Sequence, residues 1–316
     1  MLMETQIYAA KHISFDVKKR SSSGGAFTAL SDTVLSAGGC IIAARYDYQE
    51  KKLKHMIAKT VEERDAMRGS KYMVSDLGNI FKESLSMISI GTPVLFVGTP
   101  CQVLSYRCFL EKNQYNLDNV CLVDLVCHGT PMKQFWNSYI IYFEKKYGCS
   151  IDYLTFKDKR NGWRKPVAVA ECGGREISIQ DYMNLYNSAC ILQPRCYTCK
   201  LQTLKSRSSD ITIGDFWGIE KALPDFSDDE GISLIAIHTE RGRDLFDLSK
   251  NSLEIRNSDE ISCLQPNLLA PTEMSHEREA FLKDYKKYGI GFLIHKYTRT
   301  YITGKVRYKI KQALGR

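Results

Sequence analysis

Residues 93–101 read Pro93-Val94-Leu95-Phe96-Val97-Gly98-Thr99-Pro100-Cys101, which is typical of a short buried strand that ends in a turn and leads into a helix. A second apolar run, residues 120–126, ends in the same way at Cys127-His128-Gly129. Open α/β sheets gather their ligands just beyond the carboxyl ends of their strands. We therefore expect Cys101 and Cys127 to lie close together at one edge of an α/β sheet.

The rest of the chain continues the alternation of helices and strands. A helix is predicted for residues 24–38, 76–88 and 131–147, and a buried strand for residues 40–44. Beyond residue 150 the predicted strands become shorter (153–157, 167–171, 177–179, 211–213 and 234–238), with helices near 182–189, 240–250 and 275–288. The fold class predicted is α/β: a mixed open sheet flanked by helices, with a more irregular, cysteine-containing second half. We expect one domain over residues 1–290, with a sub-boundary near 150 as the alternative, and a basic tail over 291–316.

Length and composition favour a folded intracellular protein. The 316 residues are 44% apolar, which is enough for a substantial core. The chain opens with no export signal, and no run approaches the roughly 18 apolar residues that span a bilayer. Eleven cysteines, an odd number, make a disulfide framework improbable and favour reduced or metal-bound thiols. We predict a cytoplasmic location.

The net charge of +8 is concentrated near the end of the chain. Residues 290–316 carry seven Lys and Arg side chains, no acidic residue, and interspersed apolar positions. Two interpretations stay open: a basic amphipathic helix that touches an anionic membrane or a partner, and a solvated terminal helix with one face packed on the domain. No zinc-finger, RRM or homeodomain pattern accompanies the charge, so no nucleic acid is expected as a partner.

Cysteine spacing points to a metal site. The segment Arg195-Cys196-Tyr197-Thr198-Cys199 places two thiols on one turn, as zinc sites and iron-sulfur clusters require. Because only one such pair exists, iron-sulfur is favoured over zinc, while a redox dithiol is disfavoured by the loop that surrounds the pair. Together with Cys101 and Cys127 this gives four candidate ligands. The remaining seven are interpreted as buried apolar residues: Cys40, Cys108, Cys121, Cys149, Cys172, Cys190 and Cys263.

A serine-glycine loop, residues 21–25, precedes the first predicted helix. Small residues before a helix N-terminus present backbone amides to an anion, so the loop suits a phosphate or pyrophosphate, although it also fits an ordinary helix cap. Nearby cations that fit the same role, or a merely solvated one, are Lys71, Lys157, Arg160 and Arg164. His128 is interpreted as a proton donor or, alternatively, as a hydrogen-bond partner behind a ligand.

Taken in order, the motifs resemble the beta subunit family of the coenzyme F420-reducing hydrogenases and dehydrogenases. The resemblance covers residues 8–240 and rests on these segments: Ser22-Ser23-Gly24-Gly25, Gly69-Ser70-Lys71-Tyr72, Gly98-Thr99-Pro100-Cys101-Gln102, Cys127-His128-Gly129, Phe156-Lys157-Asp158-Lys159 with Gly162-Trp163, Arg195-Cys196-Tyr197-Thr198-Cys199, and Asp210-Ile211-Thr212-Ile213-Gly214-Asp215-Phe216-Trp217.

The resemblance implies FAD and a [4Fe-4S] cluster. The cluster ligands it implies are Cys101, Cys127, Cys196 and Cys199, and the flavin-binding residues are Ser22, Ser23, Gly24, Gly25, Ser70, Lys71, Thr99, Gln102 and Asp215. It assigns no catalytic residue and no particular substrate. Many bacterial relatives carry a cysteine-rich ferredoxin module ahead of the serine-glycine loop, whereas about 20 residues without cysteine precede it here. We therefore expect electrons to come from a ferredoxin or a partner subunit.

Three functional hypotheses follow. The first is a flavin and iron-sulfur oxidoreductase that passes electrons between a ferredoxin-like donor and an unidentified small-molecule or coenzyme acceptor. The second is a non-catalytic electron-transfer or accessory subunit with the same cofactors. The third is a zinc-stabilised accessory protein of surface polysaccharide biosynthesis that uses the basic tail at a membrane.

Overall fold

The computed structural model describes residues 4–298. Its main element is a nine-stranded mixed sheet with the order β12-β1-β11-β10-β6-β5-β2-β3-β4. The strands are β1 Gln6–His12, β2 Cys40–Asp47, β3 Lys52–Ala58, β4 Ser75–Asp76, β5 Val94–Gly98, β6 Val120–Leu125, β10 Ile211–Asp215, β11 Ser233–Ile237 and β12 Leu253–Ser258. The central strands β10, β6, β5 and β2 run parallel, and β3, β11, β1 and β12 add antiparallel pairings. The predicted α/β class is confirmed.

Strict alternation along the central strands explains why helices cover both faces of this sheet. In β5, Leu95 and Val97 pack on one face with helix α2 (Ala26–Ser36), and Val94 and Phe96 pack on the other. Because both faces bury apolar side chains, the strand reads as a continuous hydrophobic run. Helix α10 (Glu240–Ser249) lies on the α2 face, and the opposite face carries α4 (Ile80–Glu83), α5 (Leu85–Ser89) and α6 (Pro100–Lys112).

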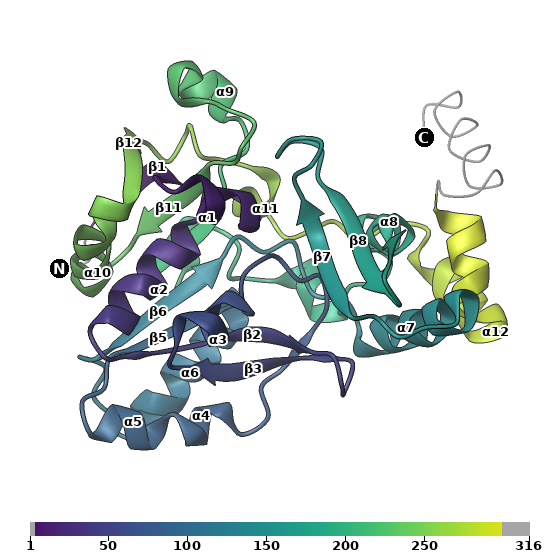
Figure 1. Ribbon diagram of the computed structural model, residues 1–316, viewed down its shortest axis with the longest axis horizontal. Coiled ribbons are helices and arrows are strands. Elements are labelled where there is room, and N and C mark those ends of the chain that lie inside the picture. The colour runs from purple at the N-terminus through teal and green to yellow at the C-terminus, as the bar shows by residue number, and fades with distance from the viewer. Residues whose placement is uncertain (1–3, 299–316) are drawn as a thin grey trace.

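A second layer of structure stands beside the sheet (Figure 1). It contains the antiparallel sheet β7-β8-β9 (Tyr153–Asp158, Val167–Cys172 and Arg175–Ser178), packed against α7 (Lys133–Tyr147), α8 (Gln180–Asn187) and α12 (Arg278–Tyr297). Its aromatic core also includes Tyr46, Leu53 and Met73 from the large-sheet half of the chain. Strands β10, β11 and β12 follow this unit in sequence and return to the large sheet, which therefore uses residues from both sides of position 150. The remaining short elements are α1 Phe15–Arg20, α3 Val61–Asp65, α9 Ile219–Ala222, α11 Pro266–Leu269, and the 3-10 turns η1 Pro194–Thr198, η2 Leu204–Ser206, η3 Pro224–Phe226 and η4 Lys250–Ser252.

One predicted helix is wrong. Residues 76–88 form strand β4 and then the two short helices α4 and α5. The break falls at Ser84, whose buried hydroxyl donates to the Phe81 carbonyl and accepts a hydrogen bond from Tyr106. A serine hydroxyl that bonds locally to the backbone in this way offers an alternative to the regular helix ladder.

The last described helix carries the start of the basic tail. Helix α12 has a non-helical residue at Gly289 (φ 75°), after which Ile290, Leu293 and Ile294 are buried against the α7 and α8 core. This agrees with the packed-helix interpretation for residues up to 298. The other basic positions of the tail lie outside the described residues, so its membrane interpretation stays a prediction. Among the described helices, none combines the length and the apolar character needed to cross a bilayer.

Candidate functional site

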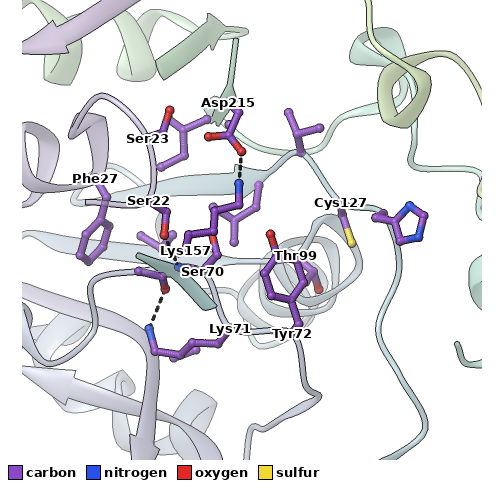
Figure 2. A pocket seen from close by; sticks show the side chains of 18 of the residues that line it. Ser22, Ser23, Phe27, Ser70, Lys71, Tyr72, Thr99, Cys127, Lys157 and Asp215 are labelled. Atoms are coloured by element: carbon purple, nitrogen blue, oxygen red, sulfur yellow. Dashed lines mark hydrogen bonds and ion pairs between the residues drawn. The ribbon is translucent and has the colours of Figure 1, made fainter. Parts of the chain in front are cut away.

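A cavity of about 460 Å³ opens at the carboxyl ends of β5, β6 and β10, where the large sheet meets strand β7 (Figure 2). Its wall combines the serine-glycine loop, the segment 67–73, the turn after β5, the segment 125–131 and the end of β10. Eight of the nine predicted flavin-binding residues line it: Ser22, Ser23, Gly25, Ser70, Lys71, Thr99, Gln102 and Asp215.

Gly24 is the exception, since it is not among the cavity-lining residues. A Cβ at this position would come within 2.4 Å of the Ala10 carbonyl oxygen and 2.7 Å of the Ser233 nitrogen. Its carbonyl accepts from the His12 N–H at 2.7 Å, and its N–H donates to the Ser233 hydroxyl at 3.0 Å. Gly24 therefore fastens the loop against β1 and β11.

The serine-glycine loop presents backbone donors to the cavity. Within residues 4–298, the main-chain N–H groups of Ser22, Ser23, Gly25 and Phe27 have no hydrogen-bond partner, and all four residues line the cavity. Gly25, at φ 95°, turns the chain into α2, so these donors gather at the N-terminus of an eleven-residue helix. Unpaired amides and the positive end of the helix dipole both favour an anion at this point.

The predicted glycine-serine-lysine turn is tied directly to that loop. The Ser22 hydroxyl accepts from the Ser70 N–H at 2.7 Å (Figure 2). The Lys71 ammonium instead donates to the carbonyl oxygens of Met67, Arg68 and Gly69 at 2.7–3.0 Å, and burial lowers its pKa to about 7. Lys71 thus holds the turn together, and its charge is not directed at a cavity ligand.

Thr99 and Gln102 have a clear local role. The Thr99 N–H and hydroxyl both donate to the Gln102 Oε1 at 3.0 Å, which forms the N-terminal cap of α6. This capping box orients the first turn of the helix and, with it, the Cys101 thiol. The Cys101 Sγ lies 3.3 Å from the Thr99 hydroxyl.

An ion pair forms the opposite wall. The Lys157 ammonium pairs with Asp215 Oδ2 (Figure 2). The other carboxylate oxygen accepts from the Trp163 indole N–H at 3.0 Å. Burial disfavours the ammonium, but Asp215 and the Tyr72 hydroxyl outweigh it, so the pKa of Lys157 is raised. Trp163 in turn stacks on the half-exposed Trp217 at 4.7 Å and an interplanar angle of 1°. The wall therefore holds a nearly buried ion pair, in which the two charges offset each other, and an aromatic surface.

A neutral histidine closes the floor between β3 and β5. The His55 Nε2 donates to the Val97 carbonyl at 3.1 Å, and its Nδ1 accepts from the Ser75 hydroxyl at 2.7 Å. Burial lowers the pKa of His55 to about 4. The imidazole is therefore uncharged at neutral pH and acts as a structural bridge.

Of the four candidate cysteine ligands, Cys101 and Cys196 both lie near enough to Cys127 to affect its pKa, whereas Cys199 shows no such interaction among the described residues. Cys127 lines the cavity, and burial raises the pKa of its thiol to about 12, with further rises from the neighbouring sulfur atoms of Cys101 and Cys196. Cys101 and Cys127 follow the adjacent parallel strands β5 and β6, as expected. Cys196 reaches the same place because the segment after β6 runs antiparallel to the one before η1, with a bridge between Pro131 and Leu192.

Backbone donors already point at these sulfur atoms. The Thr130 N–H donates to Cys196 Sγ at 3.4 Å, and the Leu201 N–H donates to Cys199 Sγ at 3.4 Å. Such N–H···S contacts are a protein's main means of tuning an iron-sulfur centre. Among the described residues, no three Cys, His, Asp or Glu side chains converge on a point where one ion would bind.

Two protein-family models match consecutive parts of this chain. The model described as coenzyme F420 hydrogenase/dehydrogenase, beta subunit N-term, matches residues 7–82, and the model of the C terminus of the same beta subunit matches residues 91–261. The chain belongs to this family. A solved structure of the F420-reducing nickel-iron hydrogenase complex from Methanosarcina barkeri contains a chain with the same fold, at 18% identity and a TM-score of 0.55, over 90% of this chain and 94% of that one. No curated protein sequence matches.

His128, a motif residue of this F420 beta-subunit homologue, lies on the cavity wall beside Cys127. Its Nδ1 contacts Asn267 and Thr272, while its buried Nε2 has no partner within residues 4–298. Burial lowers the pKa of His128. The ring is therefore positioned by the segment 267–272 and keeps one nitrogen available.

Arg160 and Arg164 do not reach the cavity of this F420 beta-subunit homologue. Arg160 pairs with Asp158 and Glu176, and Arg164 contacts Asp229. Of the four cations predicted for an anionic ligand, only Lys157 presents its charge on the cavity wall.

Three of the seven cysteines that were predicted to be free, buried apolar residues differ from that prediction. Cys149 and Cys172 are disulfide-bonded, and Cys108 is exposed on α6. The disulfide arises because β7 pairs with β8. This pairing brings Cys149, which lies just ahead of β7, close to Cys172 at the end of β8, with their Cα atoms 5.7 Å apart. A separation of 23 residues gives no sequence signal for that contact. Cys40, Cys121, Cys190 and Cys263 are buried as predicted.

A polar network behind Cys127 went unrecognised in the sequence. Asp124 and Arg207 form a fully buried ion pair at 3.3 Å, Arg207 donates to the Gln202 carbonyl, and the Gln202 amide donates to the Cys127 carbonyl at 2.5 Å. An aspartate within the otherwise apolar run of β6 was the available signal, since a buried charge requires a partner.

Proposed function

We propose that this chain is a flavin- and [4Fe-4S]-dependent oxidoreductase subunit that passes electrons between a ferredoxin-like donor and a small-molecule or coenzyme acceptor. Membership of the F420 beta-subunit family supports an electron-transfer role. One observation carries the finer proposal: Cys127 lines the cavity and also neighbours Cys101 and Cys196. That position would set a cluster directly beside a bound flavin.

The cavity residues fit FAD. The free amides of Ser22, Ser23, Gly25 and Phe27 would bind its pyrophosphate, and the volume falls within the roughly 300–1,000 Å³ of ligand pockets in general. The Lys157–Asp215 ion pair would offer a polar but overall neutral wall to the ligand. These are contributions of binding, orientation and electrostatics.

The cysteines fit a [4Fe-4S] cluster held by Cys101, Cys127, Cys196 and Cys199. Such cofactors supply one-electron and two-electron chemistry, while the protein positions them and excludes water. The capping box at Thr99 orients Cys101, the Gln202 amide holds the Cys127 backbone, and the N–H groups of Thr130 and Leu201 are available to the other two sulfur atoms. By analogy with the hydrogenase complex of similar fold, we propose that the chain works with partner subunits.

Anaerobic purification tests the proposal. The native chain should contain bound flavin. It should also contain iron and inorganic sulfide, and the amounts of these two should equal each other. Cys127→Ser and Cys196→Ser should lose most of the iron and sulfide, and Cys127→Ser should also weaken flavin binding because that residue contacts both sites.

Cys108→Ser is the matched control, because Cys108 lies exposed on the same helix as Cys101. It should keep both cofactors. A colourless native protein without iron would refute the proposal. Reduction by ferredoxin without turnover of flavin, nicotinamide or deazaflavin acceptors would favour the non-catalytic alternative.

A further inference from the structure

The segment that carries Cys196 and Cys199 is basic and free of acidic residues. Between Asp181 and Asp210 the sequence contains no Asp or Glu, but it contains Arg195, Lys200, Lys205 and Arg207. Most of the chain's net charge of +8 comes from residues 296–316, so the rest is close to neutral. The excess in this segment is therefore local.

Three of these cations are available to a partner. Arg195, Lys200 and Lys205 are exposed, and in the described part of the chain none of them forms an ion pair or a side-chain hydrogen bond. Arg207 differs, because its side chain is fully buried against Asp124. We call residues 194–205 the cysteine loop.

The cysteine loop contains two of the candidate cluster ligands, Cys196 and Cys199, and both are only partly buried. Cys199 is half-buried in it, and Gln202 donates from it to the carbonyl of the cavity residue Cys127. The segment 267–278 packs alongside, with Arg278 donating to the Tyr197 hydroxyl at 3.0 Å. That segment adds two exposed apolar side chains, Leu269 and Met274. The exposed Glu273 between them forms no ion pair with the loop cations among residues 4–298.

We propose that the cysteine loop is the docking surface for an acidic electron-carrier protein, with Arg195, Lys200 and Lys205 as its electrostatic contacts. The inference rests on the proposed function and adds the site and charge of the partner. Complementary charge steers a partner to the correct face and accelerates association, and Arg195 and Lys200 are the sequence neighbours of Cys196 and Cys199. Each encounter would pass one electron from the reduced carrier to a cluster held by these cysteines, so two encounters and two solvent protons would balance the reduction of one flavin.

Stopped-flow reduction of the anaerobic holoprotein tests this inference. The two donors are a reduced bacterial two-cluster ferredoxin, which is an acidic protein, and reduced methyl viologen, a small cation that needs no protein-docking surface. The triple variant Arg195→Glu, Lys200→Glu, Lys205→Glu should slow reduction by ferredoxin about tenfold or more at low salt. Reduction by methyl viologen should not fall. Raising the salt concentration should slow the native protein, and it should speed the variant because it screens the repulsion between the three glutamates and the acidic donor.

The control reverses two exposed charges elsewhere, Lys82→Glu and Lys112→Glu, which should leave the rate with ferredoxin within about twofold of the native value. Binding of oxidised ferredoxin, measured by calorimetry, gives a second readout that is independent of turnover. The single variant Lys205→Gln removes a charge that is not adjacent to a cysteine, so its effect on ferredoxin binding reports on docking and not on the cluster ligands. Equal ferredoxin rates and affinities in the native protein and the triple variant, at equal iron content, would overturn the docking surface. A native protein that methyl viologen cannot reduce would instead overturn the proposed function.

Discussion

Replacing Gly24 with alanine tests whether the serine-glycine loop is held from behind by the sheet. The new Cβ would meet two backbone atoms, the Ala10 oxygen at 2.4 Å and the Ser233 nitrogen at 2.7 Å. Neither atom moves easily, because Ala10 and Ser233 are paired partners in the β1–β11 ladder. The loop must therefore shift by several tenths of an ångström and strain its hydrogen bonds to His12 and Ser233.

Overpacking of this kind costs about 1–3 kcal/mol, and weakening a hydrogen bond adds about 1 kcal/mol. For a total of about 2–4 kcal/mol, the melting temperature should fall by about 4–8 °C, taking roughly 2 °C per kcal/mol for a chain of this length. The same shift displaces the free amides of Ser22 and Ser23, so we expect the Kd for FAD to rise about tenfold or more.

The assay is thermal unfolding by differential scanning fluorimetry together with flavin titration of the cofactor-stripped protein. Gly38→Ala is the matched control, since Gly38 also adjoins α2, has φ 73° and has no atom within 4 Å of the new Cβ. It should cost only about 1–2 kcal/mol of backbone strain and leave flavin affinity unchanged. A Gly24→Ala protein that melts with the control and binds FAD as the native chain does would refute the reasoning.

Three further perturbations follow from the geometry. Asp215→Asn leaves the ammonium of Lys157 unpaired in a site where both side chains are nearly buried, so we expect a loss of about 3 kcal/mol that Lys157→Met in the same chain partly restores, measured as a double-mutant cycle of melting temperatures. The pKa of His55 is lowered to about 4, so its neutral form contributes fully to stability above the pKa of about 6.5 that it has in the unfolded chain. By pH 5 the free energy of unfolding should have fallen by about 2 kcal/mol. His55→Gln should therefore make the melting temperature less dependent on pH between 7 and 5, and an unchanged dependence would contradict this. Reducing the Cys149–Cys172 disulfide should cost about 3 kcal/mol for a loop of this size, so dithiothreitol should lower the melting temperature of the native chain but not that of Cys149→Ser.

Residue patterns predicted the central strands because burial on both faces leaves a direct trace in the sequence. Val94–Gly98 and Val120–Leu125 read as continuous apolar runs, and each ends at a cysteine motif. Strand β1, Gln6–His12, mixes polar and small residues and has no clear apolar pattern, although it pairs with β11 and β12 in the large sheet. The division of residues 76–88 at Ser84 depends on a hydrogen bond from Tyr106, which no local pattern contains.

In the candidate site, too, the sequence predicted which residues are present but not which contacts they make. Motif identity brought Ser22, Ser70 and Asp215 into one list, and all three line the cavity. The roles within that list depend on neighbours that are distant in sequence: Gly24 faces the backbone of β1 and β11, and Asp215 pairs with Lys157.

The amino-acid sequence by itself determined the α/β class, the positions of the buried strands along the chain, and the cysteine, serine and glycine motifs of the candidate site. These features depend on side-chain periodicity and on motifs of a few residues. The sequence also predicted that Cys101 and Cys127 follow neighbouring strands and lie close together. Only the tertiary structure decided the other meetings: an antiparallel bridge brings Cys196 towards Cys127, and hairpin pairing joins Cys149 to Cys172. Such contacts follow from strand pairing across long separations, and a pairing register leaves no mark on the short stretches of sequence that it joins.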